Sequence, residues 1–312
     1  MVRVFKVSPN VAKMMEEYYE DFKRPKTPPY AKFQADSADV VITLYESGKA
    51  MFQGVSADIE AQLWIDQERH LNGITIENKG KEDKKKDDKK DNKKDKTFFN
   101  FSTIGSDEVG TGDYFGPIVV SSTYVSKENI SFLEELGVRD SKKITDEKII
   151  EIAPKIIKKI PYITYILTNE QYNKLKATDL NMNKIKAVLH NKVLVDLIKK
   201  EQPKYEKIVI DQFCTPKNFY GYITGAKETI KNVTFMTKAE DQVMSVAAAS
   251  IISRYIFLRE MKKMSDELGF TVLLGANNLV DEQAKKILTE QGKEALKKYV
   301  KYNFKNTEKI TK

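Results

Sequence analysis

The chain has 312 residues, of which 41% are apolar, and it carries a formal net charge of +8 with an isoelectric point near 9.1. This length predicts two domains of ordinary size. The single cysteine, Cys214, excludes an internal disulfide framework, and one Cys with two His argues against a structural zinc site. The sequence has no secretory signal and no run of about 18 apolar residues, so we expect a cytoplasmic protein with no membrane contact.

The positive charge is unevenly distributed along the chain. Residues 1–78 have a net charge of −3, residues 79–96 of +4 and residues 97–312 of +7. Residues 79–96 contain no apolar side chain, so burial cannot offset the entropy lost on ordering them. We therefore predict a first domain at 1–78, a charged flexible linker at 79–96 and a larger domain at 97–312. A lysine-rich arm that contacts phosphates is the alternative for the linker.

The first domain is predicted to be a small α+β unit. Apolar spacing predicts a helix over residues 10–24, with Asn10 as its N-cap, and another over residues 56–70, with Ser56 as its N-cap. Extended segments are expected near 30–35, 39–46 and 49–54, with a short strand at 74–76. A curved sheet with helices on one side should result.

After the linker, strands alternate with helices, which is typical of an α/β sheet with helices on its faces. Strands are predicted over residues 98–104, 117–125, 163–167, 207–211 and 233–236. Helices are predicted over residues 145–159, 183–200, 240–265 and 281–299. Thr145 is expected to begin the first of these helices, followed by acids in the first turn.

The stretch GSDEVGTGDYFGP, residues 105–117, follows the first of these strands. Asp107 and Glu108 are adjacent carboxylates, and oxygen ligands of this kind suit Mg²⁺. Neighbouring strand residues face opposite sides, so both acids can serve one site only if the strand bends there, which the glycines permit. Glycines also let backbone N–H groups approach a sugar-phosphate closely.

Two further acids can complete such a site. Asp211 ends the predicted strand 207–211, where an open α/β sheet commonly carries functional groups. Glu240 is expected to open the helix 240–265. An acid there also stabilises the positive end of the helix, so the residue pattern leaves a metal role and a helix-capping role both open. Asp241, the next residue, is the rival to Glu240.

The motif at 105–117 resembles the active-site motif of the type 2 ribonuclease H family. It is most similar to the ribonuclease HIII branch, because Thr111 stands where the ribonuclease HII branch usually has Arg. Three more segments agree: RDSKK at 139–143, LHNK at 189–192, and Glu240 with SVAAASIISR at 245–254. YESGKAMFQG at 45–54 resembles half of the TATA-box-binding-protein fold, which ribonuclease HIII carries as an extra domain. Together these matches are far more specific than any single motif.

The resemblance implies a ribonuclease H-like mixed sheet with flanking helices, plus an N-terminal TATA-box-binding-protein-like domain. It also implies that four acids hold two Mg²⁺ ions, or Mn²⁺ in their place: Asp107, Glu108, Asp211 and Glu240. The implied reaction is hydrolysis of the RNA strand of an RNA–DNA hybrid, leaving 5′-phosphate and 3′-hydroxyl ends.

The resemblance also implies substrate-binding residues. Those that contact the minor groove and its 2′-hydroxyls, the group that distinguishes RNA from DNA, are Gly110, Thr111 and Gly112. Those that contact phosphates are Ser141, Lys142 and Lys143. We expect the enzyme to act as a monomer on the hybrid duplex.

Two other functions remain open from the sequence. One is incision at single embedded ribonucleotides, as in ribonuclease HII, against which Thr111 and the extra domain argue. The other is a non-catalytic nucleic-acid-binding protein, against which the four acids argue.

Overall fold

The computed structural model describes residues 2–37, 40–54, 57–74, 76, 101–138, 144–178 and 181–311. The chain divides into two compact units, with the main division between residues 100 and 101, and each unit is described by itself. The predicted linker 79–96, the predicted cap Ser56 and residues 139–143 lie outside the described residues. Within the described parts, no helix is long and apolar enough to cross a membrane.

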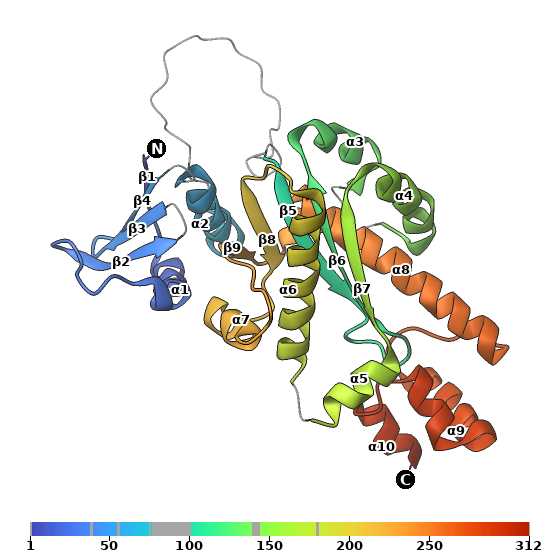
Figure 1. Ribbon diagram of the computed structural model, residues 1–312. Coiled ribbons are helices and arrows are strands. Elements are labelled where there is room, and N and C mark those ends of the chain that lie inside the picture. The colour runs from blue at the N-terminus through green and yellow to red at the C-terminus, as the bar shows by residue number, and fades with distance from the viewer. Residues whose placement is uncertain are drawn as a thin grey trace. The chain divides into compact units, whose positions relative to one another are not determined.

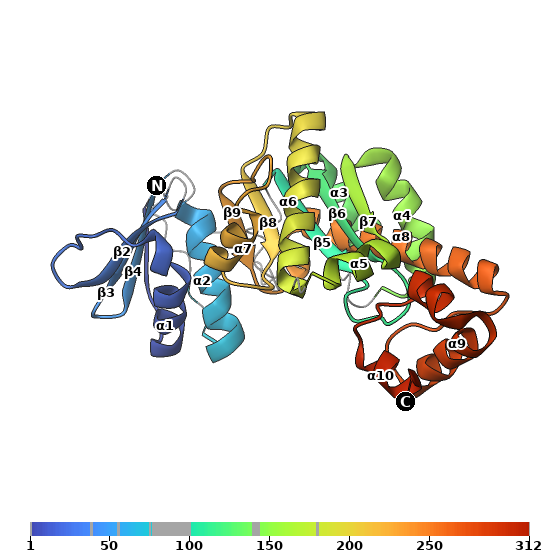
Figure 2. The same ribbon diagram turned by 60° about the horizontal axis from the view of Figure 1, so that its bottom comes forward.

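The first unit is a four-stranded antiparallel sheet in the order β1-β4-β3-β2. Its strands are β1 (Val2–Lys6), β2 (Ala31–Ser37), β3 (Val40–Tyr45) and β4 (Lys49–Gly54). Helices α1 (Pro9–Tyr18) and α2 (Ala57–Asn72) lie on one face of this sheet (Figure 2). The strand residues on that face are buried, which leaves the opposite face of the sheet open.

Four details of the first unit differ from the prediction. The helix predicted over residues 10–24 ends at Tyr18 and is followed by a short 3-10 turn, Glu20–Phe22. Strand β1 was not predicted, although its residues alternate between inner and outer positions. Helix α1 is capped by Ser8 rather than Asn10, because Pro9 occupies its first turn, where a missing N–H costs no hydrogen bond. Ile74 and Ile76 lie outside any strand, so the strand expected at 74–76 is absent from these two positions.

The second unit is built on a five-stranded mixed sheet in the order β7-β6-β5-β8-β9 (Figure 1). Its strands are β5 (Thr103–Val109), β6 (Ile118–Val125), β7 (Tyr162–Leu167), β8 (Lys207–Asp211) and β9 (Val233–Met236). Strand β6 runs antiparallel to β5 and β7, whereas β5, β8 and β9 are parallel. This mixed sheet confirms the predicted fold class.

Helices cover both faces of the second sheet. In Figure 1, α6 (Met182–Glu201) lies in front of it and α8 (Met244–Leu268) behind it. Consecutive residues of β6 serve two separate cores: Val119 packs with Phe257 of α8, whereas Val120 packs with Leu189 of α6. The two-residue period of a strand thus buries the sheet on both sides.

The remaining helices surround this sandwich: α3 (Ile130–Glu135), α4 (Asp146–Lys159), α5 (Asn169–Lys176), α7 (Pro216–Ile223), α9 (Asn278–Tyr299) and α10 (Lys305–Thr311). Helix α4 begins where predicted, and the Thr145 hydroxyl accepts a hydrogen bond from the backbone N–H of Lys148. Helix α9 is interrupted at Gly292, whose backbone is left-handed. Helices α3, α5, α7 and α10 were not predicted, because elements of 6–8 residues show little periodicity.

Candidate active site

Strand β5 carries the first two acids inside the strand rather than after it. Its pairing with β6 continues in regular register through Val109, so the bend expected at Asp107 and Glu108 is absent. The first left-handed residue is Gly110, with φ of 93°. Because the strand stays extended, Asp107 and Glu108 face opposite sides of the sheet edge, and each meets a different helix. The charge of Glu108 nevertheless raises the pKa of Asp107, so the two carboxylates interact across the strand without the bend that the sequence analysis required.

Asp107 faces α8. The hydroxyl of Ser250 bonds to its carboxylate, and the hydroxyl of Ser253 donates to its backbone carbonyl at 3.1 Å. Burial raises the pKa of Asp107 to about 8, helped by the nearby charges of Glu108 and Asp211 and opposed by the bond to Ser250. A cation bound beside this carboxylate would stabilise the charge that the surroundings disfavour.

Glu108 faces α6, where it contacts two side chains of that helix. Its carboxylate forms an ion pair with the ammonium of Lys186 and accepts a hydrogen bond of 2.9 Å from His190 Nε2. Burial by itself would raise the pKa of Glu108, but the bond from His190 and the charge of Lys186 outweigh it and lower the pKa to about 2. Glu108 is therefore held charged and in a fixed orientation.

The two α6 side chains are themselves fixed by packing. His190 is fully buried, its Nδ1 lies 2.7 Å from Ser106 Oγ, and its ring stacks on Phe213. Lys186 lies over the same Phe213 ring, 4.1 Å from its centre. Lys186 was not predicted as a site residue. Lys186 lies four residues before His190 and therefore on the same face of α6. Since His190 belongs to the LHNK motif, this four-residue spacing is the sequence signal that could have indicated Lys186.

Asp211 and Glu240 come from the part of the sheet that lies beyond β5, on the side away from β6. Asp211 ends β8, the parallel neighbour of β5, and its Oδ1 accepts a hydrogen bond of 2.9 Å from the backbone N–H of Ala239. That bond ties the end of β8 to a short 3-10 turn, η5 (Ala239–Asp241), which contains Glu240. In this turn Glu240 is half-buried, whereas Asp241 is exposed.

The expectation that Glu240 opens the long helix is wrong. Helix α8 begins only at Met244, because Lys238 is left-handed and Gln242 and Val243 are not helical. Stabilisation of the α8 N-terminus therefore does not explain why an acid stands at position 240.

The four acids thus lie on three neighbouring elements, β5, β8 and η5. As placed, no three His, Cys, Asp or Glu side chains among the described residues are close enough together to hold a metal ion. The chemistry of the donor set nevertheless fits a hard divalent cation, since every donor is a carboxylate oxygen. A hollow of about 320 Å³ is lined by Val109, Asp146, Ser250 and Arg254 among others, and Ser250 is the residue whose hydroxyl bonds to Asp107.

The glycine turn after β5 is backed by protein on one side and open on the other. A Cβ at Gly110 would lie 2.2 Å from the carbonyl oxygen of Pro117, so no other residue fits there, whereas a Cβ at Gly112 would meet nothing within 4 Å. The ammonium of buried Lys301 donates to the carbonyls of Asp113, at 2.8 Å, and Gly116, at 2.5 Å, which holds the loop that follows the turn. The candidate phosphate contacts Ser141, Lys142 and Lys143 lie outside the described residues.

Comparison with known proteins gives matches across both units. The family model for ribonuclease HII matches residues 104–307, and a model for a domain of unknown function matches residues 2–73. Ribonuclease HIII of Bacillus velezensis is 42% identical over 98% of this chain and 96% of its own length. The chain belongs to the ribonuclease HIII family. Ribonuclease HIII of Bacillus subtilis is 41% identical with the same coverage of both chains.

Solved structures agree with this assignment. The crystal structure of Bst-RNase HIII in complex with Mn²⁺ is 36% identical, has a TM-score of 0.67, and is matched over 100% of this chain and 98% of that one. Aquifex aeolicus RNase H3 is 23% identical with a TM-score of 0.53, which indicates a shared fold. The resemblance drawn from the motif is confirmed, and this member of the ribonuclease HIII family is an endonuclease of the ribonuclease H type.

Proposed function

We propose that this ribonuclease HIII hydrolyses the RNA strand of RNA–DNA hybrids at a divalent-metal site formed by Asp107, Glu108, Asp211 and Glu240. The observation that carries the proposal is the buried Asp107 carboxylate, which lies within the electrostatic influence of Glu108 and Asp211 on two adjacent strands. The Mn²⁺ complex of Bst-RNase HIII supports a divalent ion at this site.

Mg²⁺ is the expected ion, with Mn²⁺ as the alternative, because both accept carboxylate oxygens. When bound, two such ions would supply a hydroxide nucleophile and stabilise the leaving 3′ oxygen, which yields 5′-phosphate and 3′-hydroxyl ends. Asp107 is the candidate for the ligand shared by both ions. Lys186 and His190 orient Glu108 through its two carboxylate oxygens, Oε1 and Oε2.

The substrate contacts expected from the sequence are part of the same proposal. The open side of the turn at Gly110, Thr111 and Gly112 leaves room for a minor groove, and its backbone can reach 2′-hydroxyls. Ser141, Lys142 and Lys143 would hold phosphates. The proposed enzyme is a cytoplasmic monomer.

The open face of the N-terminal sheet is proposed to bind the hybrid. A row across its four strands carries exposed Val4 and half-buried Met51 and Gln34, and the Gln34 amide donates a hydrogen bond to the buried hydroxyl of Thr43. Such a mixed surface suits the floor of a shallow groove. Lys32 pairs with Glu16, whereas Lys6 and Lys49 stand directly opposite each other on β1 and β4.

A cleavage assay tests the activity. We expect Asp107→Asn to abolish hydrolysis of a labelled hybrid in Mg²⁺ while the protein stays folded, and EDTA to stop the wild-type enzyme. Asp266→Asn is the matched control, because Asp266 lies exposed on α8 in an ion pair with Lys262. A wild-type rate for Asp107→Asn would refute the site.

The same assay separates the alternative activities. A duplex with four ribonucleotides should be cut much faster than a duplex with one. Equal rates on both would indicate incision at single ribonucleotides. Binding without any cleavage would indicate a non-catalytic protein.

A further inference from the structure

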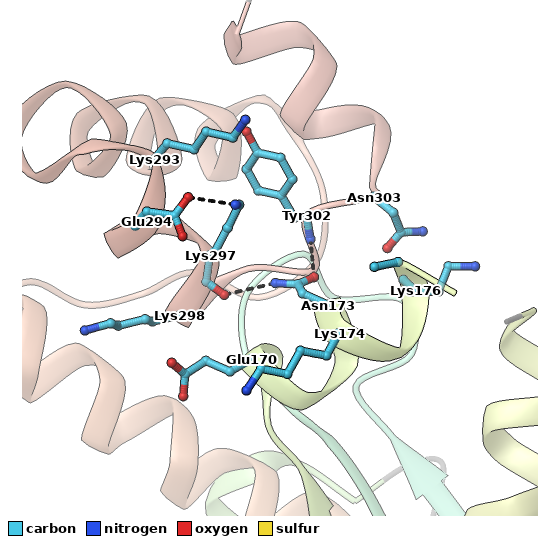
Figure 3. Close-up of a pocket in the computed structure, with 11 residues that line it drawn as sticks. Glu170, Asn173, Lys174, Lys176, Lys293, Glu294, Lys297, Lys298, Tyr302 and Asn303 are labelled. Atoms are coloured by element: carbon cyan, nitrogen blue, oxygen red, sulfur yellow. Dashed lines mark hydrogen bonds and ion pairs between the residues drawn. The ribbon is translucent and has the colours of Figure 1, made fainter. Parts of the chain in front are cut away.

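A groove of about 640 Å³ lies between helices α5 and α9, away from the four acids (Figure 3). Its lining includes five lysines, and we call it the lysine groove: Lys174 and Lys176 from α5, and Lys293, Lys297 and Lys298 from α9. Glu170 and Glu294 are its two acids, so the charged side chains in the lining sum to +3. A concave surface with this charge suits an anionic partner.

Hydrogen bonds from one asparagine side chain join the two walls of the groove. The side-chain amide of Asn173, on α5, donates to the backbone carbonyls of Lys297, at 3.0 Å, and Val300, at 2.9 Å. Its amide oxygen accepts a hydrogen bond of 2.9 Å from the backbone N–H of Tyr302. One asparagine thus fixes the two walls at a set separation, as Figure 3 shows by its dashed lines.

The distribution of charge leaves part of the groove available to a ligand. Lys297 pairs with Glu294 at 2.7 Å, and both Lys293 and Lys297 lie within about 5.5 Å of the centre of the Tyr302 ring. Lys174 and Lys298 are exposed and take part in none of the ion pairs found in the described part of the chain. Their ammonium groups can therefore contact phosphates without breaking an existing pair.

The groove is joined directly to the loop that follows the glycine turn. Phe115 and Val300 form an antiparallel bridge, the backbone N–H of Gly116 donates to Tyr299, and that of Lys301 donates to Tyr114. The segment that leaves this bridge continues at once into Tyr302, which lines the groove. The positively charged groove therefore begins two residues along the chain from the bridge that holds the glycine-turn loop.

We propose that the lysine groove binds the phosphate backbone of the hybrid beyond the cleavage site, with Lys174 and Lys298 as phosphate contacts. The inference rests on the proposed function, because it takes the hybrid as the anionic partner. It assigns the groove to affinity for long duplexes and leaves the chemistry to the acids.

The test is hybrid binding by the full chain without divalent metal, measured by fluorescence anisotropy over a series of salt concentrations. The variant is Lys174→Glu with Lys298→Glu. Each lost phosphate contact should lower the salt slope by about 0.9 and weaken binding roughly eightfold at 0.1 M salt, hence about sixtyfold for two. The maximal cleavage rate at saturating hybrid should not change. A hybrid too short to reach the groove should bind both proteins equally.

Lys285→Glu with Lys227→Glu is the matched control, since both are exposed lysines outside the groove and the double change alters the net charge by the same amount. An equal loss with this control would show a general charge effect and overturn the proposal, as would unchanged affinity in the groove variant. These binding measurements need no cleavage. Failure of the proposed activity would appear as an inactive wild-type enzyme, whereas failure of the groove would appear as an unchanged salt slope.

Discussion

The ion pair between Lys186 and Glu108 predicts an unusual response to metal. Both side chains are nearly buried, with exposed fractions of 12% and 13%. If Glu108 is a metal ligand, a bound divalent ion must compete with the Lys186 ammonium for the same carboxylate. Lys186→Met removes the competitor and keeps a side chain of similar length over Phe213.

The magnitude follows from the geometry. Two unit charges about 4 Å apart attract by about 4 kcal/mol at an effective dielectric constant near 20. Removal of one partner from a buried pair typically costs about 3–5 kcal/mol, because the other charge is left uncompensated. The metal-free variant should therefore be less stable than the wild type by about 3 kcal/mol. Metal binding no longer has to disrupt the pair, so affinity should rise by up to about a hundredfold.

Two measurements on metal-free protein check this. Titration calorimetry with Mn²⁺ should give a tighter dissociation constant for Lys186→Met. Thermal unfolding should show a lower melting temperature without metal and a larger increase when Mn²⁺ is added. Lys192→Met is the control, because Lys192 lies on the same helix in an exposed pair with Asp196. An Mn²⁺ affinity that is unchanged or weaker in Lys186→Met would refute the reasoning.

Two other predictions concern stability. A Cβ at Gly105 would lie 2.5 Å from the backbone nitrogen of Val246, so Gly105→Ala should force β5 and α8 apart. The free energy of unfolding in urea should fall by about 3 kcal/mol, and an unchanged value would contradict this contact. Burial lowers the pKa of Lys301 from 10.5 to about 7, although Asp113 opposes the shift. Between pH 7 and 10.5 the Lys301 side chain is protonated in the unfolded chain but not in the native protein. The free energy of unfolding should therefore rise with pH across this range, by up to about 1.4 kcal/mol per pH unit from Lys301. Urea unfolding of Lys301→Met should lack this rise, and equal slopes for variant and wild type would count against it.

Much of the second unit could be predicted because its signals are local. The apolar runs that became β6, β8 and β9 and the strongly periodic segment of α4 carry their structure within a few turns of chain. The motif with Asp107 and Glu108 was specific enough to indicate the family, which the comparisons confirmed. Boundaries near the site were less predictable: β5 continues through the acids, and α8 starts after Glu240. Pairing with β6 and the hydrogen bond that the backbone N–H of Ala239 donates to Asp211 override local propensity there.

The amino-acid sequence by itself determined which acids are present and that adjacent strand positions would face opposite sides. Only the tertiary structure decided what each acid meets, with α8 beside Asp107 and α6, through Lys186 and His190, beside Glu108. The lysine groove likewise joins α5 and α9, whose facing residues, such as Asn173 and Lys297, are 124 positions apart. No local pattern encodes such a pairing, because it arises from the packing of whole elements against one sheet.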